Sequence, residues 1–293
     1  METRWMYRTS GDLQELLEAS KGVCLLPIGC IEKHGPHLPL GTDTLAVDAV
    51  CYAASQLETV CVFPPFIFGD LCGAAPGMPH GTVTLPEETM LLLLEQLCDE
   101  MAKSGFEKIL LYNGHGGNGC WLNQFMRNME AKKKPYSVFY MMLKLWCHKD
   151  MAKMILEQGS GAIPELTKED EEYLIDCLNR NIERGHACLG ETAYMMGISP
   201  ESVHMEYLGV ESGLSTHASD PYKDFDVKMV DGFWPVDYPN ELCGHDPVGC
   251  NERMGKASIR LETERLARNI KMLKEDTQLR KWAMERQARL KTI

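Results

Sequence analysis

Short apolar segments alternate with longer amphipathic segments through the first half of this chain. Four runs have the length and composition of buried strands: residues 23–28, 59–63, 108–112 and 137–142. The intervening amphipathic stretches, at about 43–57, 86–104 and 118–133, predict helices. Strands that alternate with helices of this length predict a parallel sheet covered by helices on both faces. The chain is therefore expected to adopt an α/β fold.

The second half of the chain is less regular. A charged segment at about 165–184 predicts a surface helix, whereas residues 208–252 are rich in Gly, Pro, Asp and Ser, which is typical of long ordered loops. Residues from about 257 to 289 have a strongly charged amphipathic pattern and predict one C-terminal helix, a candidate for contact with a partner subunit. No repeat or low-complexity linker divides the chain, so we expect residues 1–293 to form a single domain.

Composition and charge disfavour several classes of partner. Lys and Arg number 30 against 42 Asp and Glu, for a net charge of −12, which disfavours capture of nucleic acid or of an anionic membrane. No apolar run reaches the ~18 residues of a membrane helix, and the first residues lack the pattern of a secretory signal. The 12 cysteines are scattered singly, as in a reduced protein. We expect a cytoplasmic protein that acts on a small molecule.

The most informative segment directly follows the first predicted strand. Residues 29–44 read Gly-Cys-Ile-Glu-Lys-His-Gly-Pro-His-Leu-Pro-Leu-Gly-Thr-Asp-Thr. Glu32 and His34 are two residues apart, so their side chains project to the same side of an extended loop, and the Gly-Pro turn allows Asp43 to fold back toward them. Carboxylate and imidazole ligands suit zinc, manganese or iron. The alternative is a polar loop whose acids and histidines cap helices and meet solvent.

A second polar cluster follows the third predicted strand. Residues 113–118 read Asn-Gly-His-Gly-Gly-Asn, and small residues around His115 let the backbone approach a ligand closely. Ligand sites in parallel sheets gather at the carboxyl ends of the strands, so His115 is expected beside the first cluster. A Gly-rich turn of this kind can also hold an anion on a helix N-terminus, although the Lys-Ser/Thr of a nucleotide P-loop is missing.

A third cluster, residues 185–192, reads Gly-His-Ala-Cys-Leu-Gly-Glu-Thr and joins His186 to Glu191 just before an apolar helical run. By itself this pattern is weak, because Glu191 could be an ordinary acid in the first turn of a helix. Structural or exposed positions are expected for four other histidines, His148, His204, His217 and His245.

Together the three clusters resemble the creatininase family of amidohydrolases. The matching segments are residues 32–43, 113–118 and 186–192, and residues 79–82 stand where the family has a Pro-Gly-Thr turn. The resemblance implies a three-layer α/β/α sandwich with a mostly parallel central sheet. It also implies a homo-oligomer, commonly a hexamer, and two divalent metal ions at the edge of the sheet.

The resemblance also assigns roles to individual side chains. It implies that Glu32 and His115 hold one metal ion, that His34 holds the other, and that Asp43 bridges both. Zinc is the favoured ion, with manganese or iron as alternatives, because all three accept imidazole and carboxylate ligands.

Two departures from the family pattern concern the second metal ion and the substrate. In creatininase a Glu two residues after the His of the second motif completes the second site, and Gly117 occupies this position here. We expect Glu191 to replace it, because related members with the Gly-His-Gly-Gly-Asn motif keep an acid in the third motif. Creatininase also closes its pocket with tryptophans, whereas residues 151–185 contain none. Trp121 and Trp146 are alternative candidates for a pocket lining.

The predicted reaction is metal-dependent hydrolysis of a C–N bond in a small cyclic amide or a related carbonyl compound. His186 is the candidate proton carrier, since imidazole titrates near neutrality, and Glu191 is the second candidate catalytic residue. Creatinine itself is not the expected substrate. Two alternatives stay open: a hydrolase of the same fold that cleaves a formamide or a ring C–C bond in an oxidised cyclitol or sugar, and a non-catalytic member that binds a metabolite or processed peptide.

Overall fold

A parallel sheet forms the centre of the protein. The computed structural model describes residues 1–70, 81–182, 185–222, 224–225, 234–243 and 247–289. Within these ranges the sheet has four strands in the order β2-β1-β3-β4, and each neighbouring pair is parallel. The strands are β1 (Val23–Ile28), β2 (Cys61–Val62), β3 (Lys108–Asn113) and β4 (Ser137–Met142). The two central strands, β1 and β3, are buried along their whole length, as expected for strands covered on both faces.

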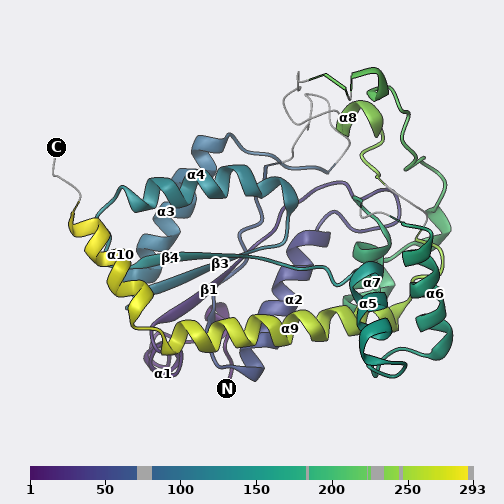
Figure 1. Ribbon diagram of the computed structural model, residues 1–293. Coiled ribbons are helices and arrows are strands. Elements are labelled where there is room, and N and C mark those ends of the chain that lie inside the picture. Colours follow the sequence, from purple (N-terminus) through teal and green to yellow (C-terminus); the bar gives the residue numbers. More distant parts are fainter. Residues whose placement is uncertain (71–80, 183–184, 223, 226–233, 244–246, 290–293) are drawn as a thin grey trace.

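Helices cover both faces of this sheet (Figure 1). Cys24, Leu26 and Ile28 of β1 pack in one cluster with α1 (Leu13–Ala19), α3 (Glu87–Lys103) and α4 (Gly119–Glu130). Val23 and Leu25 point to the opposite face, since side chains alternate along a strand. They pack with α2 (Thr42–Leu57) and the second half of α9 (Glu252–Glu275). The predicted three-layer α/β/α sandwich is therefore confirmed.

A further apolar cluster lies at one end of the sandwich, where the first half of α9 passes three shorter helices (Figure 1). These are α5 (His148–Gln158), α6 (Lys168–Asn179) and α7 (Leu189–Ile198). The charged segment that predicted a surface helix is α6, which begins at a capping box in which Thr167 and Asp170 satisfy each other's backbone N–H groups. Short helices complete the described chain: η1 (Trp5–Tyr7), η2 (Gly116–Asn118), η3 (Pro200–Ser202), η4 (Met205–Tyr207), η5 (Asp220–Tyr222) and α8 (Trp234–Asp237).

The C-terminal helix differs from the prediction. The pattern at 257–289 predicts one helix, but the chain forms α9, which ends at Glu275, and a separate helix α10 (Gln278–Ala288). Asp276 is extended, and its carboxylate accepts hydrogen bonds from the backbone N–H groups of Gln278 and Leu279. These bonds start a new helix in place of continuing the old one. The amphipathic pattern continues through this break, so periodicity alone does not reveal it.

Strand β2 is also shorter than the predicted segment 59–63. Residues 64 and 65 are both proline, which has no backbone N–H to donate to a neighbouring strand. Elsewhere, the eleven cysteines within the described ranges are all free thiols. None of the helices in those ranges combines the length and apolar character needed to cross a bilayer.

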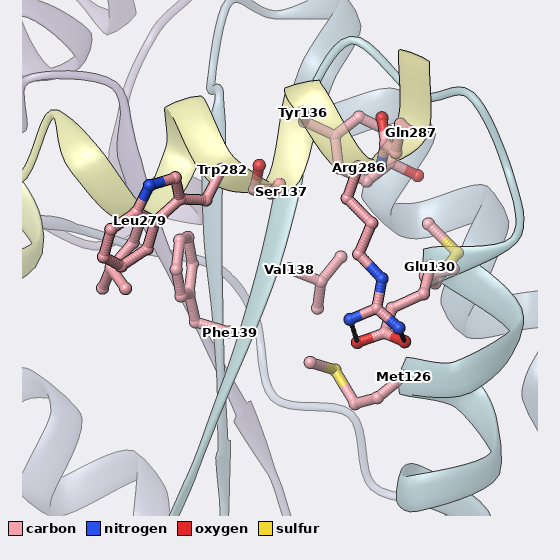
Figure 2. A pocket seen from close by; sticks show the side chains of 12 residues that line it. Met126, Glu130, Tyr136, Ser137, Val138, Phe139, Leu279, Trp282, Arg286 and Gln287 are labelled. Carbon is pink, nitrogen blue, oxygen red and sulfur yellow. Dashed lines mark hydrogen bonds and ion pairs between the residues drawn. The ribbon is translucent and has the colours of Figure 1, made fainter. Parts of the chain in front are cut away.

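A groove runs beside the edge strand β4, between α4 and α10 (Figure 2). Its volume is about 250 Å³, and its walls include Phe139 and the exposed Trp282. Arg286 of α10 spans it to form an ion pair with Glu130 at 3.0 Å. The groove contacts the first residues of β4, whereas the polar loops follow the last residues of the strands. It therefore lies at the opposite end of the sheet from the predicted site.

Candidate metal centre

The loop after β1 and the first turn of α2 supply most of the polar side chains. Gly29 directly follows β1, and a Cβ atom at this position would lie 2.5 Å from the Cα of Thr44, so only glycine lets the start of α2 pack so closely. The Thr44 hydroxyl donates a hydrogen bond to the carbonyl of Cys30 at 2.8 Å. These contacts hold Asp43, in the first turn of α2, against the loop that carries Glu32 and His34.

Asp43 is the centre of the cluster because its two carboxylate oxygens face different histidines. Oδ1 lies 3.6 Å from Nε2 of His34, and Oδ2 lies 2.9 Å from Nδ1 of His115. All three side chains are buried. A carboxylate in this arrangement can bridge two cations, which is the role that the family resemblance implies for Asp43.

Three overlapping groups of side chains each bring donor atoms within 4.8 Å of one another. Every sequence-predicted ligand belongs to at least one group. The groups are Cys30, Glu32, Asp43 and His115; His34, Asp43 and Glu191; and Glu32, His34 and His186. The first two share Asp43, whose carboxylate therefore belongs to two adjacent donor groups.

The two histidines beside Asp43 are oriented as metal ligands commonly are. Nε2 of His115 lies 2.7 Å from the carbonyl oxygen of Asp70, and Nδ1 of His34 lies 3.1 Å from the carbonyl of Glu32. If each of these nitrogens donates its proton to the carbonyl, the other ring nitrogen is the one directed at Asp43, and it could bind a cation once its own proton is lost. Nε2 of His34 is fully buried and has no hydrogen-bond partner among the described residues. A buried ring nitrogen that faces the carboxylates of Asp43 and Glu191 fits a bound cation, which would take the place of its proton.

A network of amides holds His115 in place. The Asn113 side chain accepts from the His115 N–H at 3.2 Å and donates to the His115 carbonyl at 2.8 Å. Asn118 donates to Asn113 and to the Gly29 carbonyl, and it accepts from Trp121. The side-chain amides of the turn after β3 are therefore already engaged in hydrogen bonds within the protein. The nearby carboxylates of Glu32 and Asp43 also oppose an anion there, so the geometry disfavours the alternative of a phosphate site.

Gly117, which stands where creatininase has a Glu, has no room for a side chain. A Cβ atom would lie 2.2 Å from the Asp70 carbonyl oxygen and 2.6 Å from Nε2 of His115. Instead, α7 brings Glu191 close to His34, with Oε2 of Glu191 3.9 Å from Nε2 of His34. The Ala187 N–H donates to the same carboxylate at 2.6 Å and fixes its position. This placement supports Glu191 as the replacement carboxylate.

Burial and the charges of neighbouring side chains shift the pKa values of the residues in the cluster. Burial disfavours a charge on His34, but Asp43 outweighs it and raises the pKa of His34 to about 10. The pKa of His115 rises to about 9 for the same reasons. Both histidines hold the pKa of Asp43 well below its usual range despite burial. Burial raises the pKa of Glu191 to about 7. Without a cation, the cluster therefore carries protons at neutral pH where a cation would otherwise bind.

His186 lies beside the cluster with its ring centroid 4.2 Å from that of His34. Its Nε2 lies 2.7 Å from the Lys33 carbonyl oxygen. Burial, helped by the neighbouring His34, lowers the pKa of His186 to about 3, so its ring is neutral at physiological pH. Trp234 of α8 meets this ring edge-on at a centroid distance of 5.9 Å.

Sequence reasoning did not single out Cys30 or Trp234. Cys30 is one residue among scattered thiols, and Trp234 lies in a loop-like segment without a recognisable motif. The candidates proposed for a pocket lie elsewhere: Trp121 is in the core below the second motif, and the Trp146 indole donates to Glu262 of α9. Of the four histidines expected to be structural, His148 is buried and bonded to the Ile182 carbonyl, His204 and His217 are exposed, and His245 lies outside the described residues.

The fold and this cluster define a three-layer α/β protein with a carboxylate–imidazole centre at the carboxyl ends of two parallel strands. The profile of one family, described as "Creatininase: Creatinine amidohydrolase", matches residues 6–270. The chain therefore belongs to the creatininase family, whose members named below are hydrolases.

Three similar proteins illustrate the range of the family. A mycofactocin precursor peptide peptidase of Mycolicibacterium smegmatis is 38% identical over 100 residues, which cover 32% of this chain and 39% of that protein. A 3-dehydro-scyllo-inosose hydrolase of Thermotoga maritima is 28% identical over 189 residues, or 62% of this chain and 52% of that protein. The chain thus spans about half or less of these relatives. The solved structure "Creatininase Mn" superposes with a TM-score of 0.68 at 20% identity, covering 94% of this chain and 100% of the other, and confirms the fold.

Proposed function

We propose that this protein is a metal-dependent hydrolase that cleaves a C–N bond of a small cyclic amide. The observation that carries the proposal is the buried Nε2 of His34, which lacks a hydrogen-bond partner within the described chain and faces the carboxylates of Asp43 and Glu191. In the cation-free protein this nitrogen carries a proton, since Asp43 raises the pKa of His34 to about 10, and a bound cation would take the place of that proton between the imidazole and the carboxylates. Membership of the creatininase family supports a hydrolytic reaction.

The residues divide into two proposed sets of ligands. Glu32 and His115 would hold the first cation and His34 and Glu191 the second, with Asp43 between them. Zinc is the favoured ion and manganese or iron the alternatives, because imidazole and carboxylate accept all three. Two such ions supply a water of lowered pKa and a Lewis acid for the substrate carbonyl.

The remaining task for the protein is proton transfer, which we assign to His186. Its ring lies tilted against that of His34 and is neutral, so one ring nitrogen has a lone pair that could accept a proton. It would later donate that proton to the leaving nitrogen, a step that typically contributes ~10²–10⁴-fold to the rate. Trp234 packs edge-on against the same ring and would limit its rotation and its contact with water.

A linear peptide amide is the second candidate substrate. The attack on a carbonyl carbon is the same for a cyclic and a linear amide, and a relative with 38% identity over its aligned segment is named a peptidase. A ring C–C bond beside a ketone is the third, since another relative is named a 3-dehydro-scyllo-inosose hydrolase.

Turnover by the zinc- or manganese-loaded protein tests the proposal. Creatinine and other cyclic amides, short peptides and 3-dehydro-scyllo-inosose form the substrate panel, and the His34→Ala and Asp43→Ala variants form the controls. We expect turnover of at least one amide by the wild type, and loss of both turnover and bound metal in each variant. If the variants keep full activity after chelation, the metal-dependent reaction is refuted. One metal ion or none per chain without turnover supports the non-catalytic alternative.

A further inference from the structure

Cys30 is the one member of the described donor groups to which the proposed function gives no role. It lies two residues beyond the end of β1 and is completely buried. Gly69 packs directly against it, since a Cβ atom at Gly69 would lie only 2.6 Å from the Cβ of Cys30. The thiol is therefore confined to one place, under the loop that carries Glu32.

The sulfur faces the same carboxylate atoms that His115 faces. Sγ of Cys30 lies 3.0 Å from Oδ2 of Asp43 and 3.7 Å from Oε2 of Glu32. Nδ1 of His115 lies 2.9 Å and 3.3 Å from these two oxygens. Four donor atoms from four residues thus lie close together, all within 4.8 Å of one another.

These separations suit a tetrahedral cation. Zinc binds sulfur at ~2.3 Å and nitrogen or oxygen at ~2.0–2.1 Å, and donor atoms at the corners of such a tetrahedron are about 3.3–3.6 Å apart. The four distances given above run from Sγ of Cys30 and from Nδ1 of His115 to one oxygen each of Asp43 and Glu32. They lie between 2.9 and 3.7 Å. Only small movements would convert the present hydrogen-bonded cluster into a coordination shell.

We propose that Cys30 is a sulfur ligand of the first cation, and this proposal rests on the proposed metal-dependent function. The first site would then hold its cation with one thiolate, two carboxylates and one imidazole. The thiol proton passes to solvent when the cation binds, because the thiolate is the coordinating form. A thiolate favours zinc or cobalt over manganese, since softer ligands select softer ions. Cys30 would thus make the first site selective for zinc, while the second, with oxygen and nitrogen donors only, stays permissive.

Cobalt(II) substitution tests this assignment through a signal that activity does not supply. A thiolate bound to cobalt gives a charge-transfer absorption in the near ultraviolet, which carboxylate and imidazole ligands do not give. The metal-free wild type, Cys30→Ser and Cys30→Ala would be titrated with cobalt, with bound cobalt counted after dialysis. Cys120→Ser is the matched control, because it removes an exposed thiol on α4 that could bind cobalt adventitiously. Circular dichroism of the metal-free variants verifies that each is folded.

We expect the band in the wild type and in Cys120→Ser, and its loss in both Cys30 variants. Zinc affinity should also fall in Cys30→Ser by roughly tenfold or more, with a smaller change for manganese. X-ray absorption of the zinc-loaded wild type should include a scatterer at ~2.3 Å that Cys30→Ser lacks. Cobalt bound without the band, or a band that persists in folded Cys30→Ser, overturns the role of Cys30 while the metal centre stands. Failure of the wild type to bind cobalt or zinc contradicts both the Cys30 assignment and the proposed function.

Discussion

Nε2 of His34, in the loop after β1, lies 3.9 Å from Oε2 of Glu191 on α7, although most of the sheet separates the two residues along the chain. The same ring nitrogen faces Asp43 at 3.6 Å and has no hydrogen-bond partner in the part of the chain that the structure describes. Glu191 thus reaches the cluster from α7 and not from the turn after β3. This arrangement supplies a carboxylate to His34 without using the crowded position 117.

Removal of the Glu191 carboxylate should affect one of the two proposed cations selectively. In Glu191→Gln we expect the tightly bound metal to fall from two ions per chain to one, because the first group of donors does not include Glu191. Elemental analysis of dialysed protein measures this. Glu201→Gln, at an exposed position in η3, is the matched control and should keep both ions. Unchanged stoichiometry in folded Glu191→Gln would remove Glu191 from the ligand set.

Alanine substitutions at the adjacent residues Gly116 and Gly117, in the turn after β3, should have different effects on stability. Gly117→Ala places a methyl group 2.2 Å from the Asp70 carbonyl, so we expect a loss of ~1–3 kcal/mol of stability and weaker metal binding through displacement of His115. A methyl group at Gly116 would have no atom of the described residues within 4 Å, and Gly116→Ala should change stability by less than about 0.5 kcal/mol. Urea unfolding of the metal-free variants compares the two. Equal effects at both positions would contradict the crowding argument.

Metal binding should release protons and tighten as the pH rises. In the cation-free cluster the pKa of His34 is about 10, that of His115 about 9 and that of Glu191 about 7, so protons occupy these groups at pH 7. A cation displaces them, and its apparent affinity must increase with pH until the groups are deprotonated. Calorimetric titration with zinc in buffers of different ionisation enthalpy counts the protons released. We expect at least one per chain at pH 7, and no release, or proton uptake, would be incompatible with the cluster as described.

Asp170 should stabilise the junction of α6 and α9 in a pH-dependent manner. Arg253, Asn251 and the Thr167 N–H all donate to its carboxylate, which is 4% exposed. Burial alone would raise the pKa of Asp170, but these bonds outweigh it and lower the pKa to about 2. Because the pKa is lower in the folded protein, the ionised carboxylate stabilises the fold. This stabilisation is complete above about pH 4 and is lost as the pH falls toward 2. The Asp170→Asn substitution should lower the free energy of unfolding by ~1–2 kcal/mol at pH 7.

Urea unfolding at a series of pH values from 7 down to 3 follows this difference. The exposed Asp176→Asn on the same helix is the control and should lie close to the wild type throughout. A stability difference for Asp170→Asn that does not shrink on acidification would show that the carboxylate charge is not the cause.

The sequence predicts those parts of the fold whose signals are local. Strands β1, β3 and β4 are continuous apolar runs bounded by turn residues, so their limits agree with the structure to within one residue. Glu32, His34 and Asp43 lie in one loop and one helical turn, and a short segment can indicate their proximity. His115 follows the neighbouring strand in the same parallel sheet, which places it at the same edge.

Other features depend on contacts between distant segments. Cys30 is indistinguishable in sequence from the apolar cysteines of the core, and only its approach to Asp43 reveals a different environment. Trp234 reaches His186 from an irregular segment without periodicity. The break between α9 and α10 depends on the hydrogen bonds of a single side chain, Asp276, within a pattern that otherwise continues. Residues 79 and 80 of the Pro-Gly-Thr turn lie outside the described residues.

The assembly expected from the family, a homo-oligomer and commonly a hexamer, stays a prediction. Sedimentation of the purified protein would measure it directly, and it does not enter the argument for the metal centre, because every proposed ligand comes from one chain.

Anomalous diffraction from crystals grown with zinc is the most direct measurement of the central claim. We expect two peaks, one on each side of the Asp43 carboxylate: the first within bonding distance of His115 and the second within bonding distance of His34. Peaks that avoid Asp43, or a fully liganded crystal in which these side chains point away from one another, would contradict it.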